Sequence, residues 1–254
     1  MKISFVGWIL AACVFPLLSA AAAETGRLGE TVSWPAGEKL VYDVRWGLLL
    51  AARLEYSAIP SAEHPGCWEL KGVLRTQGVV DTFYPVKVEA RSLQEPVLWR
   101  SLEYREQRAE NGEKSSQWTT INYTQKEGKN RQSEKQKNFP VPQDSVSDLV
   151  SALYGMRGVK WKEGTRREFW VCDENKMKRC EAVFVRKETV VLPATGKKTP
   201  CVVIGARPLY DDPKKIARGL GGNIWLSDDG VRRPLRADLR LKFGTVRLDL
   251  VKAL

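Results

Sequence analysis

The stretch that decides the fold lies near the start of the chain and reads Lys39-Leu40-Val41-Tyr42-Asp43-Val44-Arg45-Trp46. Apolar side chains occupy every second position and so share one face, which carries Leu40, Tyr42, Val44 and Trp46. The opposite face carries Val41, Asp43 and Arg45. This period of two is typical of a β-strand with one buried face. The stretch therefore predicts a sheet that covers a core on one side.

Similar alternation recurs along most of the chain. We expect further strands at about 50–56, 68–74, 86–92, 97–108, 117–125, 166–172, 180–192, 200–209, 222–227, 231–241 and 243–251. About eleven or twelve short strands separated by turn residues are typical of a mainly β protein. The expected fold is a curved antiparallel sheet, as an open barrel or a two-layer sandwich. Pro234 predicts a bulge or a sheet edge at its position.

One segment in the middle of the chain has helical spacing instead. Its apolar residues recur at intervals of three and four, as Val146, Leu149, Val150, Leu153 and Met156. Ser145 followed by Asp148 resembles a capping box, and Gly158 stands where a helix-ending glycine would. We expect one amphipathic helix, about 145–157, packed against the sheet. The polar run 127–138 predicts a long exposed turn or loop.

The first residues have the composition of a secretory signal peptide, residues 1–23. A charged start is followed by an almost wholly apolar run and then by small residues that end at Ala23. An alternative is a lipoprotein signal, because Leu10-Ala11-Ala12-Cys13 would place a lipid on Cys13. We favour simple cleavage, since the apolar run before Cys13 is short and continues beyond it. The protein is then exported, with the periplasm as its expected compartment.

Beyond the signal, we expect an N-terminal arm over residues 24–36 and a single β-rich domain over 37–254. No later run of apolar residues reaches the length that a transmembrane helix needs. The mature chain is therefore expected to lack a transmembrane span.

Export favours disulfides among the cysteines beyond the signal, which are Cys67, Cys172, Cys180 and Cys201. The polar segment 173–179 lies between two expected strands. A hairpin there would bring Cys172 opposite Cys180 and leave Cys67 to pair with Cys201. Free thiols are the alternative, and the lack of a C-x-x-C motif argues against a thiol-redox role.

Composition excludes several kinds of site. The only histidine is His64, so a multi-histidine zinc site is impossible and a Ser-His-Asp triad would depend on that one residue. The chain has no Walker A, G-x-S-x-G or dinucleotide-binding motif. We therefore expect no metal, no cofactor and no catalytic residue. A net charge of +11 favours anionic partners, although export and the scattering of the charge argue against nucleic acid.

Aromatic residues suggest binding. The chain has nine tryptophans, and all but Trp8 lie beyond the signal. Trp46 and Trp225 are candidate ligand-binding residues, because large aromatic rings on the inner face of a curved sheet suit an apolar ligand. They suit a packed core equally well. Asp228-Asp229-Gly230 predicts a turn, although a pair of carboxylates is also what a glycan hydrolase needs.

Three segments, in this order, resemble one known family. They are Gly37–Trp46, Asp148–Arg157 and Trp225–Leu235. Together they resemble the exported bacterial family catalogued as domain of unknown function 3108, over most of residues 37–252. The resemblance implies a secreted or periplasmic, largely β domain. It implies no particular activity.

Polar residues within these segments are further candidates for ligand binding. Tyr154 and Arg157 lie three apart on one side of the expected helix, near its C-terminus. Arg232 and Arg233 follow the acidic turn and could hold an anionic head group. The alternative for these arginines is an ion pair with a nearby aspartate.

The first functional hypothesis is a non-catalytic cell-envelope protein. It would bind an amphipathic or anionic envelope component, a lipid or a glycan, in a concave β surface. The alternative is a structural or assembly protein that binds other envelope proteins through a sheet edge. A wall-glycan hydrolase that uses carboxylates ranks behind both.

Overall fold

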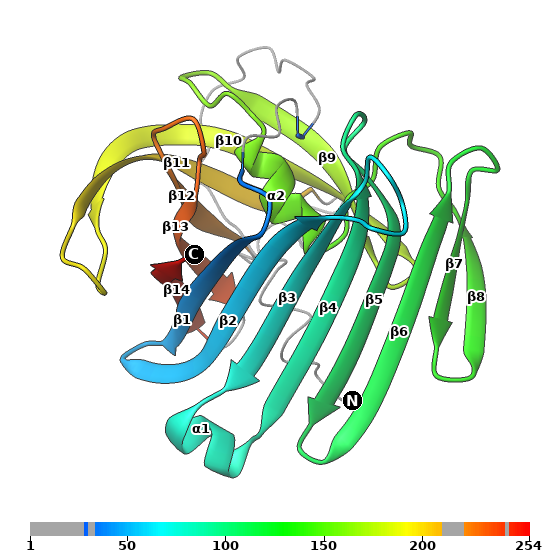
Figure 1. Cartoon of the computed structure of the whole chain (residues 1–254), viewed down its shortest axis with the longest axis horizontal. Coiled ribbons are helices and arrows are strands. Elements are labelled where there is room, and N and C mark those ends of the chain that lie inside the picture. The colour runs from blue at the N-terminus through cyan, green and yellow to red at the C-terminus, as the bar shows by residue number, and fades with distance from the viewer. Residues whose placement is uncertain (1–27, 30–33, 210–220, 242–243) are drawn as a thin grey trace.

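The computed structural model of the protein describes residues 28–29, 34–209, 221–241 and 244–254. The predicted signal peptide 1–23, including Cys13, lies outside the described residues. So does most of the predicted arm 24–36, of which only residues 28–29 and 34–36 are described. Strands make up most of the rest, which confirms the prediction of a mainly β protein (Figure 1).

The strands follow one another along the chain with two short helices between them. They are β1 (Glu38–Trp46), β2 (Leu49–Pro60), β3 (Trp68–Thr76), β4 (Val86–Glu95), β5 (Arg100–Glu110), β6 (Glu113–Asn122), β7 (Glu127–Gln132), β8 (Lys135–Pro140), β9 (Arg166–Asp173), β10 (Lys176–Val191), β11 (Lys198–Pro208), β12 (Gly221–Ser227), β13 (Pro234–Leu241) and β14 (Gly244–Ala253). The helices are α1 (Gly78–Phe83) and α2 (Ser151–Arg157). All 14 strands form one antiparallel sheet, and within the described residues its edge strands β8 and β9 are not paired with each other.

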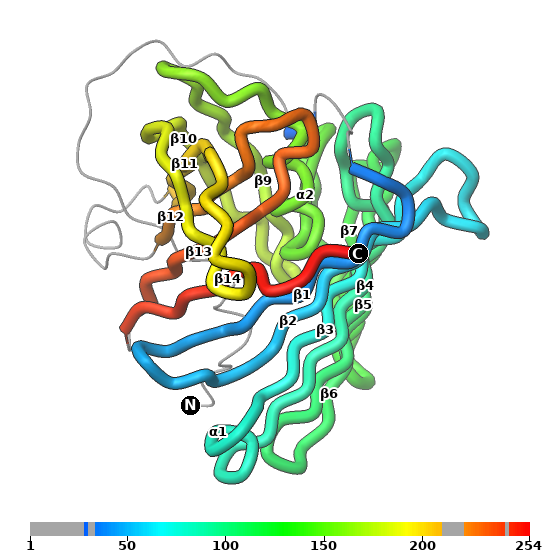
Figure 2. Tube along the Cα trace, turned by 60° about the vertical axis from the view of Figure 1, so that its left-hand side comes forward, coloured from blue at the N-terminus to red at the C-terminus, as the bar shows by residue number. Residues whose placement is uncertain are grey.

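The first strand lies in the middle of this sheet rather than at an edge. It pairs with β2 on one side and with the last strand, β14, on the other. We call β1–β8 the N-terminal half-sheet and β9–β14 the C-terminal half-sheet. The C-terminal half-sheet curls around to face the other, with α2 between them (Figures 1 and 2).

The core fills the space on the side of the sheet that bears α2. Leu40, Tyr42 and Val44 of β1 are buried there, as the alternation in their sequence predicts. We call this side the inner face and the opposite side the outer face. The register places Gly72 of β3 on the inner face too, where Val150 beside α2 approaches it. The concave side of the sheet is thus largely packed.

The helix α2 is shorter than predicted. The sequence pattern predicted a helix over about 145–157, whereas α2 begins at Ser151. The Asp148 carboxylate accepts hydrogen bonds from the backbone N–H groups of Val150 and Ser151, at 2.8 and 2.9 Å. Asp148 therefore caps the first turn of the helix itself, and the predicted start was about six residues too early.

The residues before Asp148 are extended because they link the two half-sheets. Val146 accepts a hydrogen bond from the N–H of Ser101 in β5, at 2.8 Å. Ser147 pairs with β9, where its N–H donates to Trp170 and its carbonyl accepts from the N–H of Cys172. A small apolar cluster surrounds this link and consists of Ile121, Phe139, Val141, Val146 and Cys172.

The polar run 127–138 is a pair of strands and not the predicted exposed loop. Its residues form β7 and β8, with Gln132 opposite Lys135 across a two-residue turn. Gly128 makes room for Phe139 on the neighbouring strand, because a Cβ atom at this glycine would come within 2.2 Å of the phenyl ring. The expectation at Pro234 is confirmed as a bulge, since the register shifts where Leu226 meets it.

The predicted disulfides are absent among the described residues, where Cys67, Cys172, Cys180 and Cys201 are all free. The β9–β10 turn is tighter than expected and sets Cys172 opposite Met177, while Cys180 lies opposite Phe169. Burial raises the pKa of the Cys172 and Cys180 thiols to about 12 in each case. Few reactive thiolates are therefore present at neutral pH.

Candidate binding site on the outer face of the sheet

Four of the predicted site residues gather around a carboxylate that the sequence reasoning did not single out, that of Glu38 at the start of β1. Arg157 donates to Glu38 through both terminal nitrogens, with N···O distances of 2.5 and 3.1 Å. Arg233 approaches the same carboxylate at 3.4 Å. Arg232 donates from Nε to the backbone carbonyl of Arg157, at 2.7 Å. Tyr154 lies with its ring 5.1 Å from the Arg157 guanidinium carbon. We call these five residues the Glu38 node.

The Glu38 node is buried among aromatic rings. The guanidinium carbon of Arg157 lies 5.1 Å from the ring centre of Trp34, and the Arg157 side chain has no exposed surface. Trp34 in turn packs edge-on against Trp68 and Trp99. Removing one partner of such a buried pair leaves an uncompensated charge, so the node is well suited to holding β1, α2 and the β12–β13 turn together. Ligand binding by these arginines remains a prediction.

The remaining two predicted residues lie elsewhere. Trp46 ends β1, at the opposite end of that strand from Glu38, and is 43% exposed. Trp225 is buried, and its indole N–H donates to the carboxylate of Glu188. Cross-strand register aligns Trp225 with Arg236 and so places it on the outer face. The six predicted residues therefore do not form one site.

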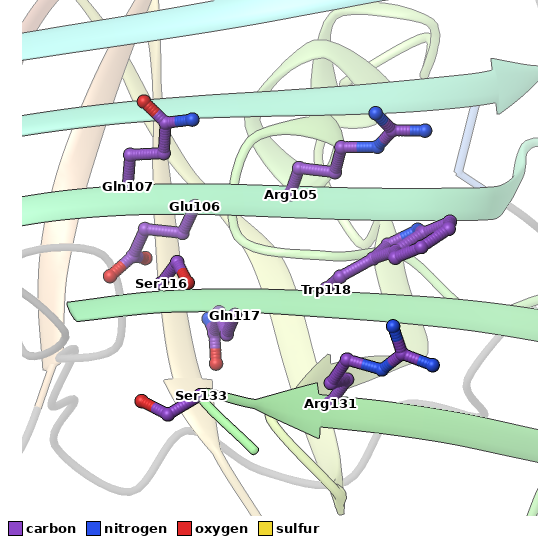
Figure 3. Close-up of a pocket in the computed structure, with 8 residues that line it drawn as sticks. All are labelled: Arg105, Glu106, Gln107, Ser116, Gln117, Trp118, Arg131 and Ser133. Atoms are coloured by element: carbon purple, nitrogen blue, oxygen red, sulfur yellow. The ribbon is translucent and has the colours of Figure 1, made fainter. Parts of the chain in front are cut away.

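A hollow on the outer face of the N-terminal half-sheet is a better candidate site. Three outward side chains stand side by side there, because Arg105 of β5, Trp118 of β6 and Arg131 of β7 are direct cross-strand neighbours. Their strand neighbour Tyr104 is buried on the inner face, which confirms their orientation. Figure 3 shows the indole of Trp118 between the two arginine side chains. We call these three residues the Trp118 site.

Polar groups complete the hollow, which has a volume of about 190 Å³. The outward side chains beside the Trp118 site are Gln107, Ser116 and Ser133. Glu106 belongs to the inner face, where it accepts hydrogen bonds from Tyr104 and Arg108 and so does not offer its charge to the hollow. The hollow is therefore bounded by amides, hydroxyls, one indole ring and two cations.

The two arginines differ in their electrostatic surroundings. Arg105 forms an ion pair with Glu103 at 2.5 Å, and this hydrogen bond raises the pKa of the guanidinium above its ordinary value. Arg131 has no carboxylate partner within the described part of the chain, and its guanidinium carbon lies 5.9 Å from the Trp118 ring centre. The corresponding distance for Arg105 is 4.7 Å. Arg131 therefore presents a positive charge that an anionic group can pair with.

The sequence reasoning missed the Trp118 site for a specific reason. It placed Trp118 in a strand but read the residues around Arg131 as a loop, so the two side chains had no predicted relation. The missing signal was weak, since β7 and β8 lack apolar alternation and Phe139 is their one large apolar residue. The described residues contain no group of three or more His, Cys, Asp or Glu side chains that could hold an ion.

Comparison with solved structures gives one likeness strong enough to show the overall fold. A β-barrel-like protein of the domain of unknown function DUF1849 from Brucella abortus superposes with a TM-score of 0.51 at 12% identity, covering 86% of this chain and 97% of its own. A candidate exported protein with a YmcC-like fold from Bacteroides fragilis has a TM-score of 0.32 at 12% identity, over 87% and 96% of the two chains. A candidate lipoprotein from Parabacteroides distasonis has 0.34 at 9%, over 91% and 100%. At these identities the likeness to the Brucella protein shows the fold alone.

Comparison by sequence gives the family. No curated protein matches this chain. Among the described residues, no helix is both long enough and apolar enough to cross a membrane. The family model described as protein of unknown function, DUF3108, matches residues 41–251, which is most of the chain and includes both the sheet and the Trp118 site. The chain therefore belongs to the DUF3108 family.

Proposed function

We propose that this protein is an exported, non-catalytic component of the cell envelope that binds an anionic glycan at the Trp118 site. The observation that carries the proposal is the exposed indole of Trp118 held between Arg105 and Arg131. Export is supported by the composition of residues 1–23, which is that of a signal peptide.

The chemistry of the hollow favours a sugar over a lipid chain. An indole face offers an apolar platform to a ring, while amide and hydroxyl groups beside it pair with ring hydroxyls. An arginine adds bidentate pairing with a carboxylate, sulfate or phosphate. An acyl chain needs an enclosed apolar cavity, whereas this hollow is open and most of the side chains around it are polar or charged. Its volume of about 190 Å³ is below the roughly 300–1,000 Å³ of pockets that enclose small ligands, so it suits one ring of a longer chain.

The acidic turn supports a non-catalytic role. Asp228 forms an ion pair with Lys187 at 2.8 Å. Asp229 accepts hydrogen bonds from the Ser227 hydroxyl and from the backbone N–H groups of Val231 and Arg232. Although burial raises the pKa of Asp229, these hydrogen bonds outweigh it and lower the pKa below its ordinary value. Asp229 therefore acts as a turn-forming group, and a general acid at this position would need the opposite pKa shift.

The sheet-edge alternative has weaker support. The edge strand β8 carries Lys135 and Lys137, both exposed. Lysines on an edge strand oppose the addition of another strand. We therefore place assembly through a sheet edge second.

Calorimetric titration tests the proposal, using the protein in the processed form that its host makes. The probes are a hexuronic acid oligomer, a sulfated hexose oligomer and a neutral hexose oligomer of equal length. We expect at least one acidic oligomer to bind about tenfold more tightly than the neutral one, a difference of about 1.4 kcal/mol. Trp118→Ala and Arg131→Gln should each weaken that binding by at least about tenfold, because each removes a central contact.

Matched variants control for general effects of the substitutions. Trp46→Ala removes an indole of similar exposure, 43% against 39% for Trp118, at the end of β1. Lys187→Gln removes an exposed positive charge from the other half-sheet. Both should bind the acidic oligomer as the unaltered protein does. Failure of all three oligomers to bind, or unchanged binding by Trp118→Ala, would overturn the proposal.

A further inference from the structure

We infer that one end of the sheet is a docking surface for an anionic lipid bilayer, on which the protein lies without spanning it. The inference rests on a set of exposed apolar side chains at the β1–β2 turn and α1, together with a row of basic residues beside them. This surface is separate from the Trp118 site and does not depend on the proposed glycan binding.

The exposed apolar set consists of large side chains that the folded protein does not bury. Leu48 is 99% exposed and Phe83 is 79% exposed. No residue of α1 is buried. We call the set the apolar rim, and its members are Trp46, Leu48, Leu49, Val79, Phe83 and Tyr84.

These residues lie at the same end of the sheet although they come from two connections. The N–H of Gln77, just before α1, donates to the carbonyl of Ala51 at the start of β2. Figure 1 shows α1 and the β1–β2 turn along one edge of the molecule, beside the β5–β6 turn. Large apolar side chains gathered at one exposed end of a folded protein are typical of an interaction site.

Basic side chains lie one step inward from the rim on the outer face. Arg75 of β3 is the direct neighbour of Lys87 of β4, and Lys114 of β6 lies two strands further in the same row, across from Ala109. We call Arg75, Lys87 and Lys114 the basic row. Arg75 and Lys114 have no carboxylate partner within the described residues, and Lys87 has only Glu89, at 3.9 Å. The nearby Asp81 is engaged by the Thr76 hydroxyl, at 2.7 Å.

An anionic lipid surface is the partner that fits this arrangement. Leucine and phenylalanine at the tip enter the boundary between head groups and acyl chains, while tryptophan and tyrosine favour the head-group level. Basic residues set back from the tip then lie beside the negatively charged head groups. A protein partner with an apolar groove would satisfy the rim but would leave the basic row unexplained.

Co-sedimentation with vesicles tests the inference, using the protein as its host processes it. One set of vesicles contains phosphatidylcholine alone, and the other contains phosphatidylcholine mixed with phosphatidylglycerol. We expect binding to the anionic vesicles, weakened by salt. The double variant Leu48→Ser with Phe83→Ser should reduce the partition coefficient at least about tenfold, since both side chains lose their apolar burial. Arg75→Gln and Lys114→Gln should each reduce it about fivefold and only on anionic vesicles.

The opposite end of the sheet provides the matched control. Val97 in the β4–β5 turn is 84% exposed, and Ile59 near the end of β2 is also exposed. The double variant Ile59→Ser with Val97→Ser should bind vesicles as the unaltered protein does. If both double variants bind vesicles equally, another segment carries the binding and the inference is wrong. Failure of the unaltered protein to bind vesicles would also overturn the inference.

Two further measurements separate this inference from its rivals. Sedimentation velocity measures the oligomeric state of the unaltered protein and of the Leu48→Ser, Phe83→Ser double variant. If the unaltered protein is an oligomer that does not bind vesicles, and the double variant is a monomer, then the rim is a protein interface and the inference is wrong. Titration of the same variant with the acidic oligomers should give unchanged affinity. Failure of the glycan proposal and failure of the lipid inference are thereby distinguishable.

Discussion

The Glu38 node and the Trp118 site both place arginines beside an aromatic ring, but they differ in the group that lies between those arginines. Each brings arginines close to a tryptophan ring. In the node, Glu38 lies between Arg157 and Arg233, and the pair with Arg157 is fully buried. At the Trp118 site the ring itself lies between the arginines, and Arg131 has no described carboxylate partner. An arginine with a carboxylate held against it supports the fold, whereas an arginine without one keeps a charge that an anionic ligand can pair with.

Removing the carboxylate of the node is the strongest way to test this contrast. Glu38→Gln should lower the free energy of unfolding by about 3–5 kcal/mol, because it leaves Arg157 buried without a counter-charge. Urea denaturation measures the loss. Glu103→Gln, which removes the carboxylate beside Arg105 at the Trp118 site, should cost less than about 1 kcal/mol because that pair is partly exposed. Similar losses of unfolding free energy in Glu38→Gln and Glu103→Gln would show that the two carboxylates support the fold equally.

A backbone change would test whether the Trp118 site depends on its supporting hairpin. Gly128→Ala sets a Cβ atom against the Phe139 ring and should destabilise the protein by about 1–3 kcal/mol. It should also weaken binding of the acidic oligomer, because β7 positions Arg131. Urea denaturation and calorimetric titration measure the two effects. Unchanged affinity despite the loss of stability would show that Arg131 does not need the hairpin.

Asp148 is another buried carboxylate, and unlike Glu38 it has hydrogen bonds but no ion-pair partner among the described residues. Burial raises its pKa above the ordinary 3.8, although the Ser101 and Ser92 hydroxyls and two backbone N–H groups oppose that rise. A raised folded-state pKa gives a contribution to stability that is complete below about pH 3.8 and lost as the pH rises through the folded-state value. We expect a smaller effect than at Glu38, since the hydrogen bonds offset part of the burial cost.

The pH dependence of the unfolding free energy measures this contribution. Other carboxyls contribute with the opposite sign, so the quantity to follow is the difference in unfolding free energy between the unaltered protein and Asp148→Asn. This difference should fall as the pH rises above about 3.8, because the asparagine side chain does not titrate. An identical pH profile in both proteins would show that Asp148 has the same affinity for protons folded and unfolded.

The smallest expected change is in stability at the Trp118 site itself. Trp118→Ala and Arg131→Gln should each alter the free energy of unfolding by no more than about 0.5 kcal/mol, as substitutions of exposed residues usually do. Both should nevertheless lose binding. Thermal unfolding measures the stability of each variant, and calorimetric titration measures its binding. A large loss of stability in Trp118→Ala would show that Trp118 supports the fold, as the Glu38 node does.

The sequence allowed the sheet to be predicted wherever one face of a strand is apolar. The alternation in β1 and in Val246, Leu248 and Leu250 of β14 is of this kind, and all three of these β14 residues are buried. The pattern does not report which strands are neighbours, so β1 beside β14 could not be predicted. It also fails where the buried positions carry no apolar alternation: Gly128 and Asn130 are the buried residues of β7, and neither is a large apolar residue, so β7 and β8 were taken for a loop.

The candidate sites were predictable only in part, because their partners are distant in the chain. Arg157 was singled out, but Glu38 stands 119 residues earlier, and no local pattern connects the two. The disulfide prediction failed because a two-residue turn, rather than the whole polar segment 173–179, joins β9 and β10. Arg131 carries no distinctive motif, and only the cross-strand register brings it to Trp118.

The pairing of the first strand with the last has a consequence for the order of folding. Lys39 exchanges hydrogen bonds with Leu254 in both directions, so β1 reaches its second neighbour only when the end of the chain is in place. The hairpins of β1–β8 are local in sequence and form without waiting. Closure between β1 and β14 joins residues separated by almost the whole chain, and contacts of such separation form slowly. A chain that emerges N-terminus first therefore holds β1 with one edge unpaired until the ten residues of β14 have been made.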